Sequence, residues 1–484
     1  MARTQLHLEH LLRRGGFGAS PGELAALGNM SMSQGISYLV NYEDQPDDVD
    51  SKIGQPNYLS VVARGVSSAN TTIEDARQRW LFRMVHSQRP LQEKMALFWH
   101  NHFATAYSKI AGTVGAVQGT KMLALKEGEL PGPRGQLETF RAYALGSFRD
   151  LLIEVAKDPA MLVWLDGRLN TRQRPQENFG REIMELFTFG IGNYTEEDVY
   201  AAARVFTGWN LRLVNRGADA ENYYEFQYVP NNHDTSEKSF TFAIYGNGSK
   251  TIPARAAADG MQDGIDFITA LATHPKTAER LARRLWHYFV TDAFDPDPDF
   301  VRGASSIYLV NQTRIEPVIR YVMQSRWFQN PGNWFSRYSW PVEFAVRAVK
   351  EVGYAGFNAD LMRAPLAAMG QVLFEPPDVN GWELGKGWFS TGAMLARMNF
   401  ASQIAANQRG SLATAAAAAK ESPEKMVEFF LDRLSPAPFE DGSLGELHAY
   451  LRAGSAWTGS AAQLQTKSAG LARLIVGSAE YQLV

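Results

Sequence analysis

The chain of 484 residues contains no cysteine. Disulfide bonds, a thiolate nucleophile, cysteine-ligated zinc and iron–sulfur clusters are therefore excluded, because each of them requires a cysteine sulfur. The absence of cysteine is compatible with export from the cell but does not require it.

Long apolar runs are also missing. The first residues, MARTQLHLEHLLRRGGFGASPGEL, contain no apolar segment of the signal-peptide type, and no stretch approaches the roughly 18 uninterrupted apolar residues of a spanning helix. The sequence thus predicts neither a signal peptide nor a membrane span. We expect a cytoplasmic location by default, with export alongside a partner or after removal of a leader as the alternatives.

Neither sign of charge is in excess. The 48 basic and 51 acidic side chains leave a net charge of −3, and no run of lysine and arginine is dense enough for a phosphate-binding surface, so we exclude nucleic acid as a partner. The chain also lacks the Gly-x-Ser-x-Gly elbow, the phosphate-binding loop and the Gly-x-Gly-x-x-Gly turn. The commonest hydrolase, nucleotide and dinucleotide signatures are therefore absent.

Helix-start signals recur along the chain. The segment SPGEL supplies Ser20 as an N-cap, Pro21 at the first helical position and Glu23 as a capping-box partner, and TEED from Thr195 and SPEKM from Ser422 repeat this chemistry. Helical periodicity predicts helices at residues 6–13, 20–41, 72–86, 90–105, 138–157, 178–189, 195–206, 262–290, 299–308, 315–325, 341–352, 359–371, 391–406, 423–434, 443–452 and 461–477. We therefore expect a mainly α protein built as a multi-helix orthogonal array.

One region has the alternation of a β-hairpin. The segments NYYEFQYV and SFTFAIYG alternate aromatic or β-branched residues with polar ones, and PNNHDTSEK separates them, which predicts a small hairpin near residues 222–246. The hairpin would be an insertion between two helical parts. We accordingly expect an N-terminal helical module at 1–210, the hairpin and its loop at 211–260, and a C-terminal helical module at 261–484 packed on the first.

A weak internal repeat favours two related modules. The order Trp-His, glutamate on a helix, Gly-Trp occurs as Trp99-His100, Glu182 and Trp209, and again as Trp286-His287, Glu343 and Trp382. The spacings differ, and Trp-His is a short match in a chain with 11 tryptophans, so a coincidence is the alternative to a duplication.

The helix in ENFGREIMELFTFG carries charges beside an apolar stripe. On a wheel of about 100° per residue with Phe179 at zero, Glu182 falls near 300°, inside the apolar sector, while Arg181 and Glu185 lie on the opposite flank. A carboxylate that faces the core must be paired, protonated or bound to a metal. Glu182 is therefore either a metal ligand or acid–base group, or one half of an ion pair with Arg13, Arg14 or Arg204.

Two histidines in FWHNHF supply further candidates. His100 and His102 diverge by about 200° on a regular helix, so they cannot both bind one ion from the same face, and only His102 points inward. We predict a possible divalent metal site that draws on His100, His102, Glu182 and Glu185. A neutral core histidine is the alternative for His102.

The hairpin connection contains His233 and Asp234. These two residues are a candidate proton-transfer pair, although an aspartate in a turn more often accepts hydrogen bonds from its own backbone. In the enzymatic interpretation Glu182, His102, His233 and Asp234 are catalytic, and Arg181, Arg204, Trp209 and Trp382 contact the substrate.

Several motifs together resemble a known family. In order, HLLRRGGFGASPGEL, FWHNHFAT, ENFGREIMELFTFGIGNYTEEDVYAAARVFTGW, HD, RLWHYFV and PPDVNGW followed by LARMNF resemble the bacterial domain-of-unknown-function family 1800 over nearly the whole chain. The sequence departs from the family after Asp234, where TSEKSF replaces a glycine, a lysine and a short apolar turn. The resemblance implies no activity, but it implies a gene neighbour of the alkaline-phosphatase and sulfatase-like type that carries an export signal.

Two hypotheses follow. The first is a metal-assisted hydrolase with its polar site between the helices predicted at 90–105 and 178–189, which requires a cleft there. The second is a non-catalytic binding or assembly partner of a sulfatase/phosphatase-like exported protein. It requires a filled interior at the same residues, with the aromatic loops near Trp209 and Trp382 exposed to the partner.

Overall fold

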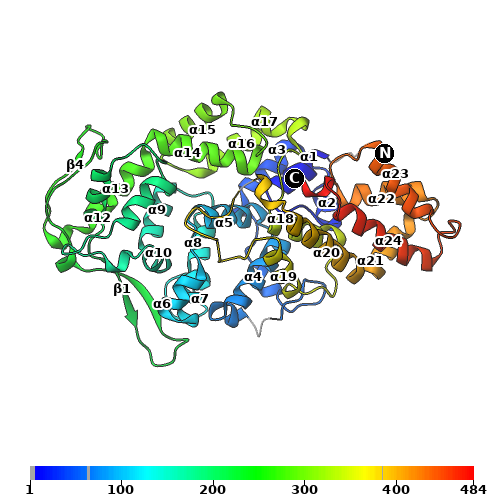
Figure 1. Ribbon diagram of the computed structural model, residues 1–484, viewed down its shortest axis with the longest axis horizontal. Helices are drawn as coiled ribbons and strands as arrows, with labels where there is room; N and C mark the ends of the chain where they lie inside the picture. The colour runs from blue at the N-terminus through cyan, green and yellow to red at the C-terminus, as the bar shows by residue number, and fades with distance from the viewer. Residues whose placement is uncertain (1–5, 63–65, 384) are drawn as a thin grey trace.

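The computed structural model describes residues 6–62, 66–383 and 385–484, which form 24 α-helices and four short strands. Figure 1 shows an elongated array of helices, with α21 to α24 at one end and β1, β4, α12 and α13 at the other. The helices of the first half are α1 (Leu6–Arg14), α2 (Pro21–Leu27), α3 (Met32–Val40), α4 (Ile73–His86), α5 (Pro90–His102), α6 (Tyr107–Val114), α7 (Ala116–Ala124), α8 (Gln136–Ala142), α9 (Phe148–Lys157), α10 (Pro159–Trp164), α11 (Glu177–Glu182) and α12 (Glu196–Val205). Those of the second half are α13 (Met261–Thr273), α14 (Pro275–Leu285), α15 (Pro298–Val310), α16 (Ile315–Gln324), α17 (Arg326–Gln329), α18 (Pro341–Val352), α19 (Asp360–Ala368), α20 (Thr391–Asn407), α21 (Arg409–Ala416), α22 (Pro423–Leu434), α23 (Asp441–Arg452) and α24 (Ala461–Val476). The predicted mainly α class is confirmed.

Local start signals divide three long predicted helices. The segments predicted as single helices at 20–41, 138–157 and 262–290 each form two helices. Ser31 and Ser147 cap α3 and α9 by accepting backbone N–H groups, and Pro275 begins α14. Apolar periodicity continues across these signals, but the caps restart the backbone hydrogen bonding. Short helices α6, α7, α10 and α17 lie outside the predicted ranges.

The β-hairpin is present, but its strands pair differently from the prediction. Strand β2 (Tyr223–Tyr228) pairs antiparallel with β1 (Trp209–Val214), whereas β3 (Lys238–Ser239) pairs with β4 (Thr251–Ile252). The predicted pairing of 222–229 with 239–246 is therefore wrong. Residues after β3 turn into the core instead: the Phe240 ring stacks on Phe267 of α13 at 4.9 Å, and the Thr241 N–H donates to Asp198.

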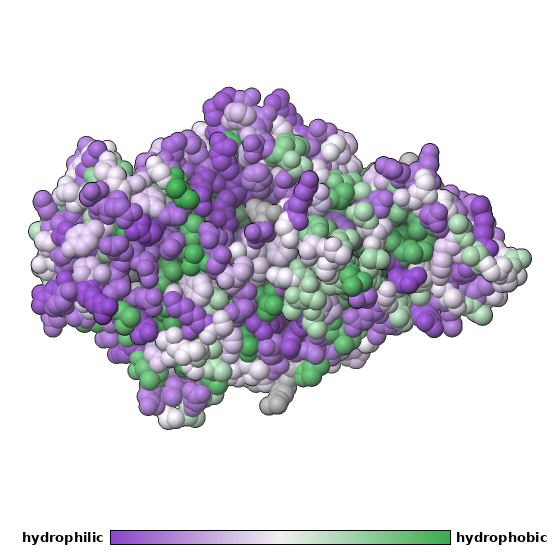
Figure 2. Space-filling view, in the orientation of Figure 1, coloured by the Kyte–Doolittle hydropathy of each residue, from purple (hydrophilic) through white to green (hydrophobic). Residues whose placement is uncertain are grey.

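The interior is one apolar core that extends through both halves, from Leu8 to Tyr481. The visible face in Figure 2 is more hydrophilic over the end that carries α12 and α13, and mixed with apolar patches over the other half. Within the described ranges no helix combines the length and the apolar character that a membrane crossing needs.

Segments from both ends of the chain meet near the centre. The Arg14 guanidinium donates to the carbonyls of Phe289, Val290 and Asn333 at 2.8 to 3.1 Å. The last residue, Val484, forms two backbone hydrogen bonds with Arg337, and Figure 1 shows the C-terminus beside α1 and α18. The division into modules at 1–210 and 261–484 stays a prediction.

Candidate functional site

His102, at the C-terminal end of α5, is enclosed by aromatic rings. Its side chain is 1% exposed, and its Nε2–H donates to the Phe187 carbonyl at 3.1 Å. The surrounding rings belong to Phe98, Trp99, Phe103, Phe148 and Phe187. Burial first, and then the positive charges of Arg284 and Arg280, hold the pKa of His102 well below its usual value. His102 is therefore a neutral core histidine that ties α5 to the segment after α11.

His100 is 2% exposed and lies in another part of the core, so the expectation that only His102 points inward is wrong. Its Nε2 accepts the backbone N–H of Phe374 at 3.1 Å, and its ring contacts Trp80 and Trp382 edge-on. Burial lowers the pKa of His100 to about 3. The imidazole is therefore neutral and carries its proton on Nδ1.

The helix that carries Glu182 is not a regular α-helix. α11 ends at Glu182, and residues Ile183–Phe187 continue as a π-helical turn. Extra residues in a π-helical turn rotate all later side chains away from the positions of a regular wheel. Glu182 is half-buried, and burial and the neighbouring Glu185 raise its pKa against the effect of Arg181. Glu182 is thus only partly buried, whereas the wheel predicted that it faces the core, and a regular wheel cannot place the residues after it.

The flanking charges of α11 have local partners. Arg181 pairs with Glu196 at 2.7 Å and more distantly with Glu177 at 3.5 Å. Glu185 accepts a short hydrogen bond from the Tyr194 hydroxyl. The Arg181–Glu196 and Glu185–Tyr194 contacts link the α11 region to the start of α12.

His233 lies in a closed polar cluster beneath β3. His233, Lys238 and Asp263 are all fully buried, and Asp263 Oδ2 lies 3.2 Å from His233 Nε2 and 2.6 Å from Lys238 Nζ. The other ring nitrogen of His233 contacts the Thr207 carbonyl at 2.8 Å, and Arg255 approaches the second oxygen of Asp263 at 3.1 Å. Through Asp263, the cluster holds the 233–238 connection against α13.

Asp234 does not share a geometry with His233. It pairs with Arg204 at 2.8 Å, and its backbone N–H donates to the Thr207 hydroxyl at 2.9 Å. The Arg204 contact and the Ser236 backbone N–H hold the pKa of Asp234 below its usual value, although burial alone would raise it. Asp234 and Arg204, predicted as catalytic and substrate-binding, thus contact one another at the surface of α12.

The two predicted surface tryptophans are core residues. Trp209 is 1% exposed and packs edge-on against Phe206 and Phe226, whereas Trp382 is 4% exposed. The backbone N–H of Trp382 donates to the Asn101 side chain at 2.6 Å. Neither indole offers a contact surface for a substrate or a partner.

The candidate metal ligands do not meet. His100 and His102 engage separate backbone groups, and Glu185 is engaged by Tyr194. Across the described ranges, no three histidine, aspartate or glutamate side chains gather in a way that could hold a metal ion. Arg280 and Arg284, which act on His102, would also oppose a cation there.

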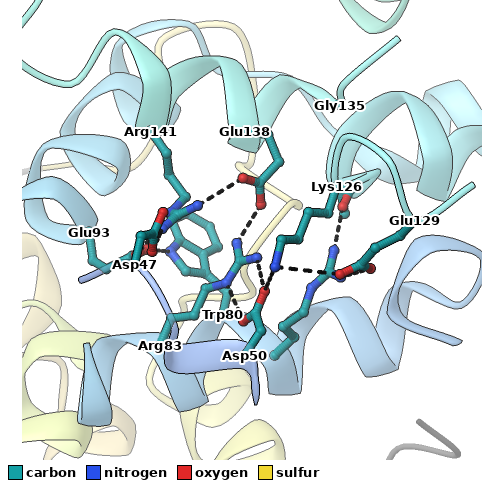
Figure 3. Close-up of polar contacts among 12 residues, drawn as sticks. Asp47, Asp50, Trp80, Arg83, Glu93, Lys126, Glu129, Gly135, Glu138 and Arg141 are labelled. Carbon is teal, nitrogen blue, oxygen red and sulfur yellow. Dashed lines mark hydrogen bonds and ion pairs between the residues drawn. The ribbon is translucent and has the colours of Figure 1, made fainter. Parts of the chain in front are cut away.

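Sequence reasoning missed a buried ion network between α4 and α8. Figure 3 shows Arg83 between Asp50 and Glu138, with Arg141 and Lys126 completing the set. Arg83 donates to Asp50 at 2.7 Å and makes a short contact with Glu138, while Arg141 bonds Glu138 at 2.8 Å. The network extends to Asp47, Glu93 and Glu129, and from Glu129 to Arg79 and from Glu93 to Trp80. Two of its pairs are three residues apart in the sequence, but the contacts that join them come from separate segments and leave no local pattern.

A second network joins the halves of the chain. Lys94 on α5 and Arg337 both contact Glu343 on α18, Arg337 at 2.6 and 2.7 Å. The three side chains are at most 3% exposed. Burial would raise the pKa of Glu343, but the two cations lower it to about 2, and burial lowers the pKa of Lys94 to about 8. The same glutamate also caps α18 by accepting the Trp340 N–H at 2.8 Å.

Because of these networks, we expect the free energy of unfolding to decrease at acid pH. Arg83 and Arg141 outweigh burial and lower the pKa of Glu138 to about 2, the same value as for Glu343. An unfolded glutamate titrates near about 4.3, so the stabilisation is complete above that pH and is lost as the pH falls through about 2, at roughly 3 kcal/mol per carboxyl. We expect the urea concentration at the midpoint of unfolding to decrease as the pH is lowered from 5 to 2.5. The fall should be smaller in Glu138→Gln, and an equal fall in both proteins would contradict the assignment.

Fold and site together define a mainly helical protein with buried ion networks in its interior. The family model described as "Protein of unknown function (DUF1800)" matches residues 10–483, and the chain belongs to this family. The resemblance carried by the motifs is thereby confirmed. Comparison with curated proteins and with solved structures gives no match.

Proposed function

We propose that the chain is a non-catalytic binding or assembly protein. The observation that supports this function best is the filled interior around His102, whose Nε2–H is engaged by the Phe187 carbonyl and whose ring is enclosed by aromatic side chains. A catalytic or metal-bound histidine needs an open position for the reacting group. Here that space is occupied by the protein itself.

The metal-assisted hydrolase remains the second candidate because of Glu182. Its pKa is raised, first by burial and then by Glu185, and a carboxyl group with a raised pKa is typical of general acid–base residues. Glu182 and His102 would be its central residues.

Metal content distinguishes the two functions. We expect protein purified without chelator to hold no stoichiometric divalent metal. His102→Ala should lower the free energy of unfolding by about 1–3 kcal/mol, because the buried Phe187 carbonyl loses its donor. Glu182→Ala, at a half-buried position, should change it by no more than about 0.5 kcal/mol. One metal ion per chain that both substitutions remove would refute the proposal and favour the hydrolase.

The proposed partner is the sulfatase/phosphatase-like exported protein that the family resemblance implies. Leu395 and Met398 of α20 are 58% and 51% exposed and lie three residues apart, so they share one helix face. Exposed apolar side chains on one face are typical of contact surfaces. We propose this pair as part of the partner contact in place of Trp209 and Trp382.

Co-expression with that neighbouring protein tests the contact. We expect the two proteins to co-purify, and Leu395→Glu combined with Met398→Glu to abolish co-purification without changing the melting temperature. Val310→Glu on α15 is the matched control, because Val310 is an apolar residue that is even more solvent-exposed, at 78%, and lies on another helix. If co-purification is lost in both the α20 double variant and the Val310→Glu control, or in neither, the role of α20 is contradicted.

A further inference from the structure

A pocket lies between α2, α3, the C-terminal end of α4 and α18. Its volume is 390 Å³, within the range of about 300–1,000 Å³ that small-molecule sites occupy. The lining residues include Tyr38 and Tyr354 together with the polar residues Glu23, His86 and Lys350. It is separate from the α5–α11 region and from α20.

The glycine turn after α1 makes this pocket possible. Gly18 has a φ of 78°, and a Cβ atom there would come within 3.0 Å of Arg347 Cγ on α18. Only glycine combines this conformation with such a close approach. The turn is followed by the capping box of α2, in which the Ser20 N–H donates to Glu23 Oε2 at 2.7 Å. The motif GGFGASPGE thus places Glu23 beside α18.

The charged groups of the pocket compensate each other. Lys350 Nζ donates to Glu23 Oε1 at 2.9 Å, and the Lys350 side chain is 2% exposed whereas that of Glu23 is 39% exposed. Burial would raise the pKa of Glu23, but the neighbouring Lys350 holds it below its usual value, so Glu23 is a carboxylate at neutral pH. The pair contributes no net charge.

His86 supplies a neutral donor. Its Nε2 accepts the Leu59 N–H at 2.9 Å, so its proton is on Nδ1. Burial, followed by the charge of Lys350, lowers the pKa of His86 to about 3. Among the residues that the structure describes, neither this Nδ1–H nor the Tyr354 hydroxyl has a hydrogen-bond partner in the protein.

We infer that this pocket, defined by Glu23, Lys350, His86 and Tyr354, binds a small neutral, hydroxyl-rich molecule of the monosaccharide or polyol class. Hydroxyl groups both donate and accept, which matches a carboxylate beside an ammonium, an imidazole N–H and a phenol. The absence of net charge favours an uncharged ligand over an anion or a cation. The aromatic rings of Tyr38 and Tyr354 in the lining are compatible with the apolar faces of a sugar ring.

Ligand-observed NMR on the full chain tests this inference. The probes are glucose, galactose, mannose, N-acetylglucosamine and myo-inositol at millimolar concentration, with glucose 6-phosphate and glucosamine as charged comparators. We expect saturation transfer to at least one neutral probe and weaker transfer to the charged ones. Lys350→Met should weaken the binding by about tenfold or more, because it removes a charged hydrogen-bond donor.

A pair of surface variants separates binding from folding. Ala26 is exposed on α2 and lines the pocket, so Ala26→Trp should obstruct it and abolish binding with an unchanged melting temperature. Ala25 is exposed on the same helix outside the lining, so Ala25→Trp should bind as the unmodified chain does. The inference is overturned if no neutral probe shows transfer, if a charged comparator binds more strongly, or if Ala26→Trp leaves binding intact. None of these results bears on the α20 contact or on the metal content.

Discussion

Replacement of Arg83 by methionine is expected to lower the free energy of unfolding by about 3–5 kcal/mol. Arg83 is 1% exposed and is the cation shared by Asp50 and Glu138. Methionine preserves much of the side-chain length but leaves both carboxylates facing each other in the interior. Lys126 still reaches Asp50 and Arg141 still reaches Glu138, so the loss should be large without preventing folding.

Urea unfolding at pH 7 measures this effect. Arg302→Met is the matched control, because Arg302 is 73% exposed and pairs with Asp299 on the same helix. The control should change stability by no more than about 0.5 kcal/mol. Combining Arg83→Met with Glu138→Gln should cost less than the sum of the two single changes, because the second removes a charge that the first left unpaired. Additive costs would show that the two residues do not form one network.

Much of the helical fold could be predicted because its signals are local. Ser20, Thr195 and Ser422 begin helices where the sequence placed N-caps. The same kind of signal at Ser31 and Ser147 was masked by apolar periodicity that runs through the caps, so helices were joined that the backbone separates. Strand pairing failed for another reason. Alternation identifies a strand but not its partner, and β2 pairs with β1 instead of the later segment.

For the candidate site residues, the sequence predicted helical phase but not the long-range contact partners. The phase of α5 separated His100 from His102 correctly, and the structure places them on different core contacts. The partners themselves could not be predicted, because the Phe374 N–H and the Phe187 carbonyl are distant in the chain. The same holds for Glu343, which lies 249 positions from Lys94. Long-range ion pairs leave no periodic trace in the sequence.

Two π-helical turns lie at different places in the proposed internal repeat. Ile183–Phe187 follows α11 and the glutamate of the first copy, whereas Trp286–Val290 follows α14 and begins at the Trp-His pair of the second copy. In each turn side chains donate to backbone carbonyls: Arg280 and His102 donate to the first, and Arg14 donates to the second. The glutamates paired by the repeat differ, however, since Glu343 is held by two cations and Glu182 is half-buried. The two π-helical turns thus occur in different side-chain environments.

Replacement of Glu343 by glutamine is the second large change that we expect, again about 3–5 kcal/mol of unfolding free energy. Glutamine keeps the shape of the side chain but leaves Lys94 and Arg337 as two unpaired cations with almost no solvent contact. It also weakens the cap on the Trp340 N–H. Because Lys94 belongs to α5 and Glu343 to α18, this single change should loosen the contact between the two halves of the chain.

The double variant Glu343→Gln with Lys94→Met gives the decisive measurement. Removing Lys94 deletes one of the unpaired cations, so part of the lost stability should return despite the second substitution in the core. Glu279→Gln is the control, since Glu279 pairs with Lys276 at the surface with both side chains over 40% exposed. If Glu343→Gln costs no more than Glu279→Gln in urea unfolding at pH 7, the buried network does not hold the halves together. If it costs several kcal/mol and Lys94→Met restores part of them, the electrostatic tie between α5 and α18 is established, because a loss of packing alone could not be reversed by deleting a second side chain.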